Sequence, residues 1–145
     1  MGLIFLWAFF DKLFGLRFAT SPDKSWLAGG SPTYGFLTMA AKGPLSPISN
    51  AIAGNLFVDW LFMMGLFLIG VALVFGVMVN VASYSGALLM FLMWSAVLPP
   101  ENNPVLDDHI IYALVLILFS KLGAGDYLGF GRKWNKFIGK NKWLK

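Results

Sequence analysis

The sequence predicts an all-α membrane protein: a four-transmembrane-helix bundle with short outer-side helices in the first loop and an interfacial C-terminal helix. Of its 145 residues, 58% are hydrophobic and 12% are charged, about half the charged fraction of an ordinary globular domain. A soluble chain of this size lacks the interior volume to bury so many apolar side chains. The 41 residues from 60 to 100 include no acidic or basic side chain. Six of the eleven basic residues lie between Arg132 and the C-terminus.

The first predicted helix covers residues 2–19 and is barely long enough to cross a bilayer. Residues 1–10 are almost entirely apolar, Asp11 and Lys12 interrupt the run, and residues 13–16 are apolar again. A signal peptide places its basic residues before the apolar run and a small-residue cleavage site after it. The order here is reversed, which predicts a helix that is not cleaved.

The loop that follows, residues 20–55, is rich in Gly, Pro and Ser, which favour turns. Two stretches within it, 34–41 and 44–53, are apolar but too short to cross a membrane. We expect two short helices here that lie on the membrane or dip into the mouth of the bundle.

The uncharged run has room for two crossings, because a helix of about 20 residues spans the hydrocarbon core. Its most polar positions, 80–83, are the expected turn, so the sequence predicts helices over 57–79 and 83–98. Both must be helical, because lipid offers no hydrogen bonds to an unpaired backbone.

A fourth crossing is predicted over residues 107–122. It begins with Asp107 and Asp108, which suit the positive end of a helix, and then runs without a charge to Lys121. Residues 1–123 therefore form the predicted transmembrane bundle.

Residues 124–145 differ from the bundle and are expected to form a basic amphipathic tail. Aromatic and apolar side chains recur there at helical spacing, at Tyr127, Trp134, Phe137 and Ile138, with basic residues between them. This pattern is typical of a helix that rests on anionic lipid. A solvated basic tail is the alternative.

The basic tail also predicts the orientation, because cytoplasmic segments carry the excess of Lys and Arg. Four crossings then place both termini in the cytoplasm and the loops 20–55 and 98–106 outside. The polar residues of the bundle gather at its outer end. They are Asp11, Lys12, Asp59, Trp94, Glu101, Asn102, Asn103, Asp107, Asp108 and His109.

Ionisable groups inside a membrane are costly and are candidates for a functional site. We expect Lys12 to pair with Asp59 or Asp108. One hypothesis is a purely structural cluster that locks the helices together, comprising Asp11, Lys12, Asp59 and Asp107. The absence of cysteine and the single histidine argue against a metal or haem site held by this chain alone. No array of basic and aromatic residues indicates nucleic-acid binding.

Five segments resemble the DoxX family (DoxX/DoxD-like small integral membrane proteins). They are FLWAFFDKLFGLRFAT (5–20), GGSPTYGFL (29–37), VDWLFMMGLFLIGVAL (58–73), LPPENNPVLDDHIIYALVL (98–116) and LGFGRKW (128–134). The resemblance implies a four-helix bundle in a prokaryotic plasma membrane. One relative is the large subunit of an archaeal thiosulfate:quinone oxidoreductase, and other members are associated with oxidative-stress membrane complexes. Members usually carry further residues before the first helix, often with an arginine.

The resemblance implies a subunit of a quinone-linked redox complex, which oxidises thiosulfate or another sulfur compound or acts in oxidative stress. Asp108, His109 and Lys12 are then the candidates for handling protons, and Trp94, Glu101 and Asn102 the candidates for binding quinone. This chain has no ligand set for a redox centre, so a partner subunit has to supply the electrons. A non-catalytic scaffold or accessory subunit of a larger membrane assembly is the alternative, and a small transporter is a third hypothesis.

Overall fold

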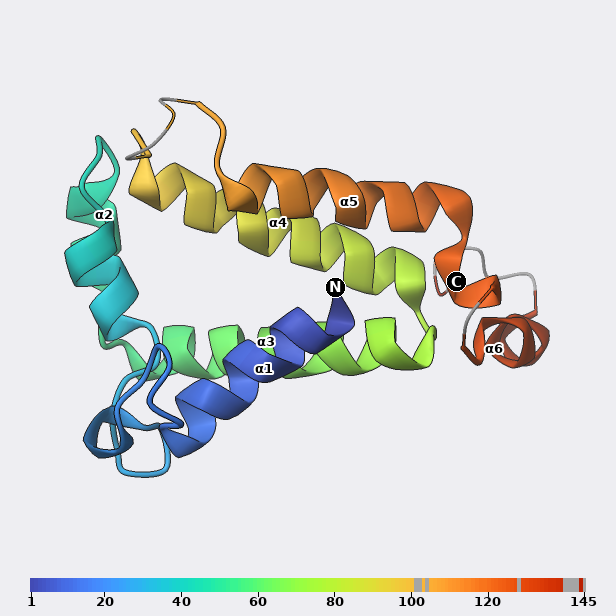
Figure 1. Cartoon of the computed structure of the whole chain (residues 1–145), viewed down its shortest axis with the longest axis horizontal. Coiled ribbons are helices and arrows are strands. Elements are labelled where there is room, and N and C mark those ends of the chain that lie inside the picture. The colour runs from blue at the N-terminus through green and yellow to red at the C-terminus, as the bar shows by residue number, and fades with distance from the viewer. Residues whose placement is uncertain (101–102, 104, 128, 140–143, 145) are drawn as a thin grey trace.

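The computed structural model describes residues 1–100, 103, 105–127, 129–139 and 144, and every regular element among them is helical (Figure 1). This confirms the all-α prediction. The elements are α1 (Gly2–Phe14), η1 (Pro22–Lys24), η2 (Phe36–Ala40), α2 (Ser46–Ile52), α3 (Leu56–Phe75), α4 (Val79–Val97), α5 (Asp108–Leu122), η3 (Ala124–Asp126) and α6 (Gly131–Ile138).

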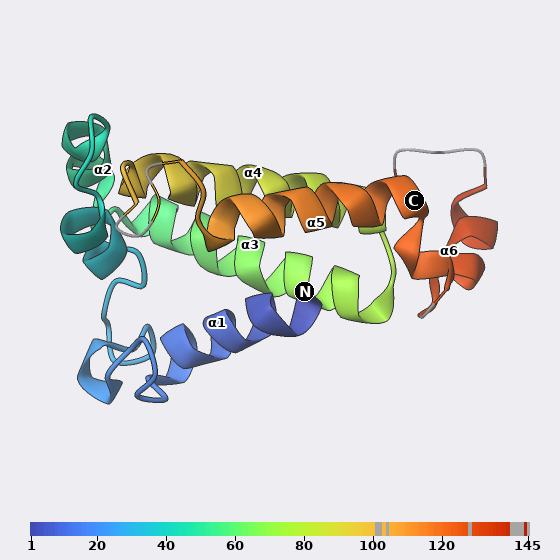
Figure 2. The ribbon, with the colours of Figure 1, turned by 45° about the horizontal axis from the view of Figure 1, so that its top comes forward.

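The four longer helices pack in chain order, α1 against α3, α3 against α4, and α4 against α5 (Figure 2). Two short helices lie across the ends of this array. Helix α2 crosses one end, and α6 crosses the other, where it is seen end-on while the long helices lie in the plane of the view (Figure 1). We call these the α2 end and the α6 end.

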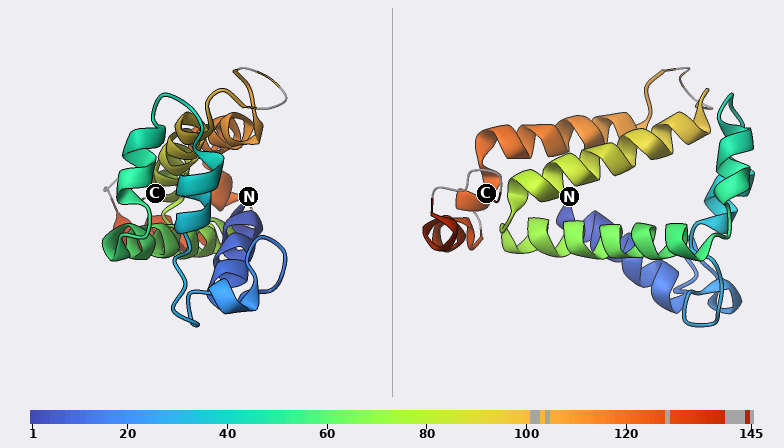
Figure 3. Two further views of the ribbon diagram at one scale, coloured as in Figure 1. Left: turned by 90° about the vertical axis from the view of Figure 1, so that its left-hand side faces the viewer. Right: turned by 180° about the vertical axis from the view of Figure 1, so that it is seen from behind.

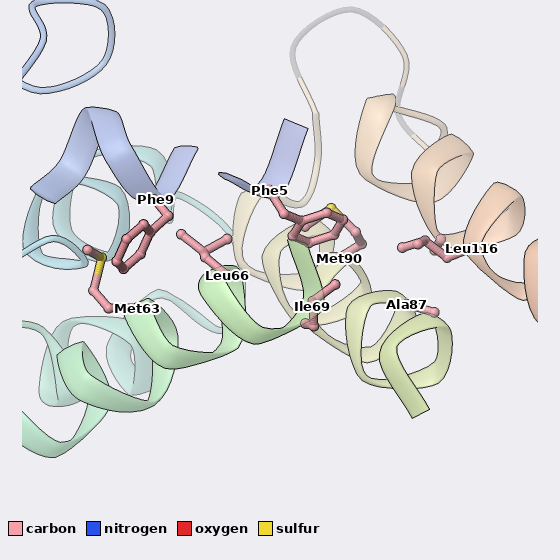
Figure 4. Close-up of a cluster of buried hydrophobic side chains, with 9 residues drawn as sticks. Phe5, Phe9, Met63, Leu66, Ile69, Ala87, Met90 and Leu116 are labelled. Atoms are coloured by element: carbon pink, nitrogen blue, oxygen red, sulfur yellow. The ribbon is translucent and has the colours of Figure 1, made fainter. Parts of the chain in front are cut away.

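The core lies where α1, α3, α4 and α5 meet (Figure 4). Its centre is Gly86 of α4, where a Cβ atom would lie 3.1 Å from Leu116, 3.3 Å from Ile69 and 3.4 Å from Phe5. The missing side chain at Gly86 therefore lets side chains from the other three helices converge on α4.

Among the described residues, two helices are long and apolar enough to cross a membrane, α3 with 20 residues and α4 with 19. Helices α1 and α5 have 13 and 15 residues, fewer than the roughly 20 that a straight crossing needs.

Helix α1 is shorter than the predicted span 2–19, because it ends at Phe14. Gly15 adopts the left-handed conformation, φ 68°, and caps the helix through its backbone N–H. The chain then reverses, so Arg17 lies exposed in a loop and is not part of the first helix. The glycine was the signal for this boundary.

The turn between α3 and α4 also differs from the prediction, because it lies at residues 76–78 and not at 80–83. Gly76 and Met78 have φ values of 69° and 50°, which turn the chain. The polar residues that suggested a turn point into the bundle: Asn80 Oδ1 accepts a hydrogen bond from Ser120 Oγ at 2.9 Å, and Ser83 is fully buried.

The remaining elements lie close to their predicted positions. The two apolar stretches of the first loop include η2 and α2, and α5 begins directly after Asp107. The tail includes the amphipathic helix α6, which packs against the bundle through a hydrogen bond from Phe130 N to Phe75 O of 2.8 Å. Seen from behind, α2 and α6 close the two ends of the molecule (Figure 3).

Candidate functional site

Three carboxylates from three different elements lie at the α2 end. Asp11 is in the last turn of α1, Asp59 is in the first turn of α3, and Asp107 is the N-cap of α5. The antiparallel packing brings them to this end, as the predicted topology requires. Each of them nevertheless belongs to a separate hydrogen-bond network.

Asp11 is buried, with 2% of its surface exposed. Its Oδ1 accepts a hydrogen bond from Phe18 N at 3.2 Å, and its Oδ2 accepts one from Ala19 N at 3.0 Å. The carboxylate therefore satisfies backbone donors of the loop that follows α1, which is a structural role.

Asp59 is also buried, with 4% exposed. Its Oδ1 accepts three hydrogen bonds, from Ser31 Oγ at 2.9 Å, Thr33 Oγ1 at 2.6 Å and Thr33 N at 3.2 Å. Asp59 thereby ties the first loop to α3. Sequence reasoning did not find Ser31 and Thr33, because nothing in their spacing links them to Asp59, which lies 28 and 26 positions later.

Lys12 does not form the expected pair with Asp59 or Asp108. Among the described residues no carboxylate lies within 4.0 Å of its ammonium group. For Asp59, hydroxyl and backbone donors already bond to its Oδ1. For Asp108, the helices are apart, because α1 packs on α3 whereas α5 packs on α4. The backbone oxygen of Lys12 accepts a hydrogen bond from Trp26 N at 2.9 Å.

Asp107 and His109 form a carboxylate–imidazole pair at this end. Asp107 Oδ1 caps α5 by accepting from His109 N at 3.1 Å and Ile110 N at 3.3 Å. Its Oδ2 lies 2.6 Å from His109 Nδ1. Both side chains are partly exposed, 17% for Asp107 and 24% for His109. Within the described part of the chain His109 Nε2 has no hydrogen-bond partner, so it can face a ligand.

The carboxylate fixes the imidazole ring in position and in tautomer. With Nδ1 donating to Asp107, the neutral ring presents a lone pair at Nε2 and the protonated ring presents an N–H there. The pair can therefore accept a proton and offer it at one defined atom.

A cavity of about 460 Å³ with both polar and apolar walls borders this pair. Its lining includes Lys42 from the first loop, Asn103 from the loop before α5, and Asp107, Asp108 and His109. Asp108 is exposed in the first turn of α5. Lys42 is a residue that the predicted site did not include; its distance in the sequence hid it.

Trp94 stabilises the loop before α5. Its indole Nε1 donates to Val105 O at 2.8 Å, and Asn103 Oδ1 accepts from the backbone of Val105 and Leu106. The N–H group that was expected to bind quinone is therefore occupied. The other two predicted quinone-binding residues, Glu101 and Asn102, lie outside the described residues.

A second cavity, of about 470 Å³, lies between α3 and α4 and is almost entirely apolar. Phe36 of η2 lines it, and the Phe36 ring lies 6.5 Å from the imidazole of His109, centroid to centroid. Gly65 lines it from α3, and a Cβ atom there would meet no heavy atom within 4 Å. His109 itself does not line this cavity, and Phe36 is the side chain that connects the two.

Metal binding has no support in the described part of the chain, where no group of three or more His, Cys, Asp or Glu side chains is close enough to hold an ion. The arrangement instead suits a small organic molecule with a long apolar portion and a polar group that accepts or donates a proton. No family model matches the sequence, and no curated protein or solved structure is significantly similar to it.

Proposed function

We propose that this protein is a quinone-binding integral membrane subunit of a redox complex. It crosses the bilayer four times, with both termini in the cytoplasm. The observation that carries the proposal is the Asp107–His109 pair beside the apolar cavity. The resemblance to the DoxX family implies the same ligand class independently.

Apolar side chains along the outer faces of α1 and α5 support four crossings. On α1, Leu3, Trp7, Phe10 and Phe14 form one stripe at helical spacing, and each is at least 40% exposed. On α5, Ile111, Leu114, Leu118 and Leu122 do the same, each at least 51% exposed. Stripes of this size at a water interface mark contact with protein or lipid.

The two transverse helices support the same topology. Helix α3 has 20 residues, which at 1.5 Å per residue is about 30 Å, the thickness of the hydrocarbon core. Helices α2 and α6 thus lie one bilayer thickness apart, at the levels expected for the two interfaces. The shorter helices α1 and α5 pack along α3 and α4, and we expect the bilayer to thin locally around them.

Cysteine labelling tests the topology cleanly, because the protein has no native cysteine. Lys24→Cys at the α2 end is expected to react with an impermeant maleimide added to intact cells. Lys136→Cys on α6 is expected to react only after permeabilisation. Labelling of position 136 in intact cells contradicts the proposed orientation.

In the proposed site the cavity between α3 and α4 would hold the quinone tail, and Phe36 and His109 would lie beside the head group. A bound quinone would supply the two-electron chemistry. His109 would contact the head group through Nε2, and Asp107 would hold the imidazole ring in position. The sequence offers no ligand set for a redox centre, so a partner subunit would supply the electrons.

Titration of the purified protein with decylubiquinone tests the site. His109→Ala removes the donor and is expected to weaken binding about tenfold, the effect of roughly 1.4 kcal/mol. Gly65→Leu fills the cavity and is expected to abolish binding. Leu68→Phe, which adds bulk on the exposed side of α3, is the control and is expected to bind normally.

The scaffold hypothesis makes the opposite prediction. It is favoured by the hydrogen bonds that the carboxylates of Asp11 and Asp59 accept from the first loop, which indicate that these two groups serve the fold. Under that hypothesis decylubiquinone binds weakly or equally well to the wild type and to all three variants. Equal binding overturns the quinone site.

A further inference from the structure

The α6 end of the molecule is basic and aromatic. From residue 121 onward the sequence has seven basic residues and one acidic residue, Asp126. Arg132, Lys133 and Lys136 of α6 are exposed, and the aromatic side chains of Tyr127, Phe130 and Phe137 are 78%, 52% and 83% exposed.

Helix α6 is held in a fixed position across the end of the bundle. Asp126 supplies two of the acceptors: its backbone oxygen accepts from Arg132 Nε at 3.0 Å, and its Oδ1 accepts from Asn135 Nδ2 at 2.6 Å. The second of these bonds uses one carboxylate oxygen of Asp126, the only acid in the sequence from residue 121 onward. The lysines at 133 and 136 have no carboxylate within 4.0 Å among the described residues, so their charge is available to a partner.

A polar cavity of about 260 Å³ lies between α6 and the bundle. Its polar lining comprises Asn80 of α4, Lys121 of α5, Asp126, and Trp134 and Asn135 of α6. The donors of Trp134 and Asn135 are occupied, by Leu144 O and Asp126 Oδ1. Lys121 is exposed at the last turn of α5, so its ammonium group lies at the edge between the cavity and the surface. The recess is large enough for a phosphate group, and Lys121 is the cationic donor that it offers at its edge.

We propose that α6 and the end of α5 form a binding site for anionic phospholipid, in which Lys121, Lys133 and Lys136 contact the phosphate groups and Phe130 and Phe137 enter the acyl boundary. The proposal rests on the membrane-spanning part of the proposed function and is independent of quinone binding. Three features favour lipid over another acidic partner. The helix lies across the ends of the spans, aromatic side chains alternate with the charges, and the surrounding charge is positive apart from Asp126.

The test measures how phosphatidylglycerol stabilises the purified full-length protein in detergent, from its melting temperature as a function of lipid concentration. The wild type is expected to be stabilised by phosphatidylglycerol but not by phosphatidylcholine or inorganic phosphate. The double variant Lys133→Gln/Lys136→Gln is expected to need roughly 25-fold more phosphatidylglycerol for half the effect, from about a fivefold loss per charge.

The matched control removes two exposed charges at the opposite end, Arg17→Gln/Lys24→Gln, and is expected to respond as the wild type does. Lys121→Gln is expected to weaken the response about fivefold. An unchanged response in Lys121→Gln overturns the role of the cavity. An equal response in the two double variants, or equal stabilisation by phosphatidylcholine or phosphate, overturns the site. Any of these results leaves quinone binding at the α2 end untouched, so the two proposals fail separately.

Discussion

Asp59 and Asp107 both stand at the start of a long helix, at the same end of the molecule, and their surroundings differ. Asp59 is 4% exposed, and its Oδ1 accepts three hydrogen bonds from the first loop. Asp107 caps its helix with one oxygen and holds the imidazole of His109 with the other. The pair lines one cavity and lies beside Phe36, which lines a second. The first arrangement stabilises a fold, and the second controls a titratable group next to space for a ligand.

The largest expected effect concerns Asp59. Asp59→Ala leaves the buried donors of Ser31 and Thr33 without an acceptor, and is expected to lower the free energy of unfolding by about 3–4 kcal/mol. Thermal melting in detergent measures this. Asp108→Ala at the exposed start of α5 is the matched control, with an expected loss below about 1 kcal/mol. Equal melting temperatures for the two variants contradict the structural role of Asp59.

Asp11 is expected to show a smaller effect of the same kind. Asp11→Asn keeps one oxygen acceptor and replaces the other with an amide donor that faces a backbone N–H. The loss is expected to be about 1–2 kcal/mol, one charge-assisted hydrogen bond, in the same melting assay. A loss as large as that of Asp59→Ala would mean that Asp11 has a further partner in the membrane.

Lys12 is expected to show the smallest effect of the three. Its ammonium group has no carboxylate within 4.0 Å in the described structure, so Lys12→Met removes a partly buried charge without breaking an ion pair. The free energy of unfolding is expected to change by less than about 1 kcal/mol, or to rise. A loss of several kcal/mol would restore the pairing with a carboxylate that the sequence suggested.

The sequence predicted the helical class well, because apolar runs and the glycines and prolines between them are local signals. The shared end of Asp11, Asp59 and Asp107 was also predictable, since it follows from antiparallel order alone. The predicted turn at 80–83 is wrong, because the polar side chains there are not exposed to solvent. Asn80 and Ser83 are polar but face the bundle, and Gly76 was the stronger signal.

The individual contacts of the site could not be predicted. Asp59 bonds to Ser31 and Thr33 because the first loop folds back over α3, and no local pattern indicates how far it reaches. The same holds for Lys42, which lines the cavity at His109. The pair of Asp107 and His109 is different: a capping aspartate two residues before a histidine is a local arrangement, and the spacing alone brings the two side chains together.

The most direct test of the proposed site is the affinity for decylubiquinone of the wild type, Asp107→Asn and His109→Ala, measured under one set of conditions. In the wild type Nδ1 faces Asp107, so the imidazole ring presents Nε2 to the head group. His109→Ala removes this contact and is expected to weaken binding about tenfold.

Asp107→Asn retains the helix cap, because asparagine is an equally good N-cap, but its amide donates to Nδ1 and moves the ring proton to Nε2. Nε2 of this variant therefore carries a donor, and decylubiquinone is expected to bind at least as tightly as to the wild type, at an unchanged melting temperature. Equal binding of decylubiquinone to the wild type and to His109→Ala contradicts a quinone site at the Asp107–His109 pair.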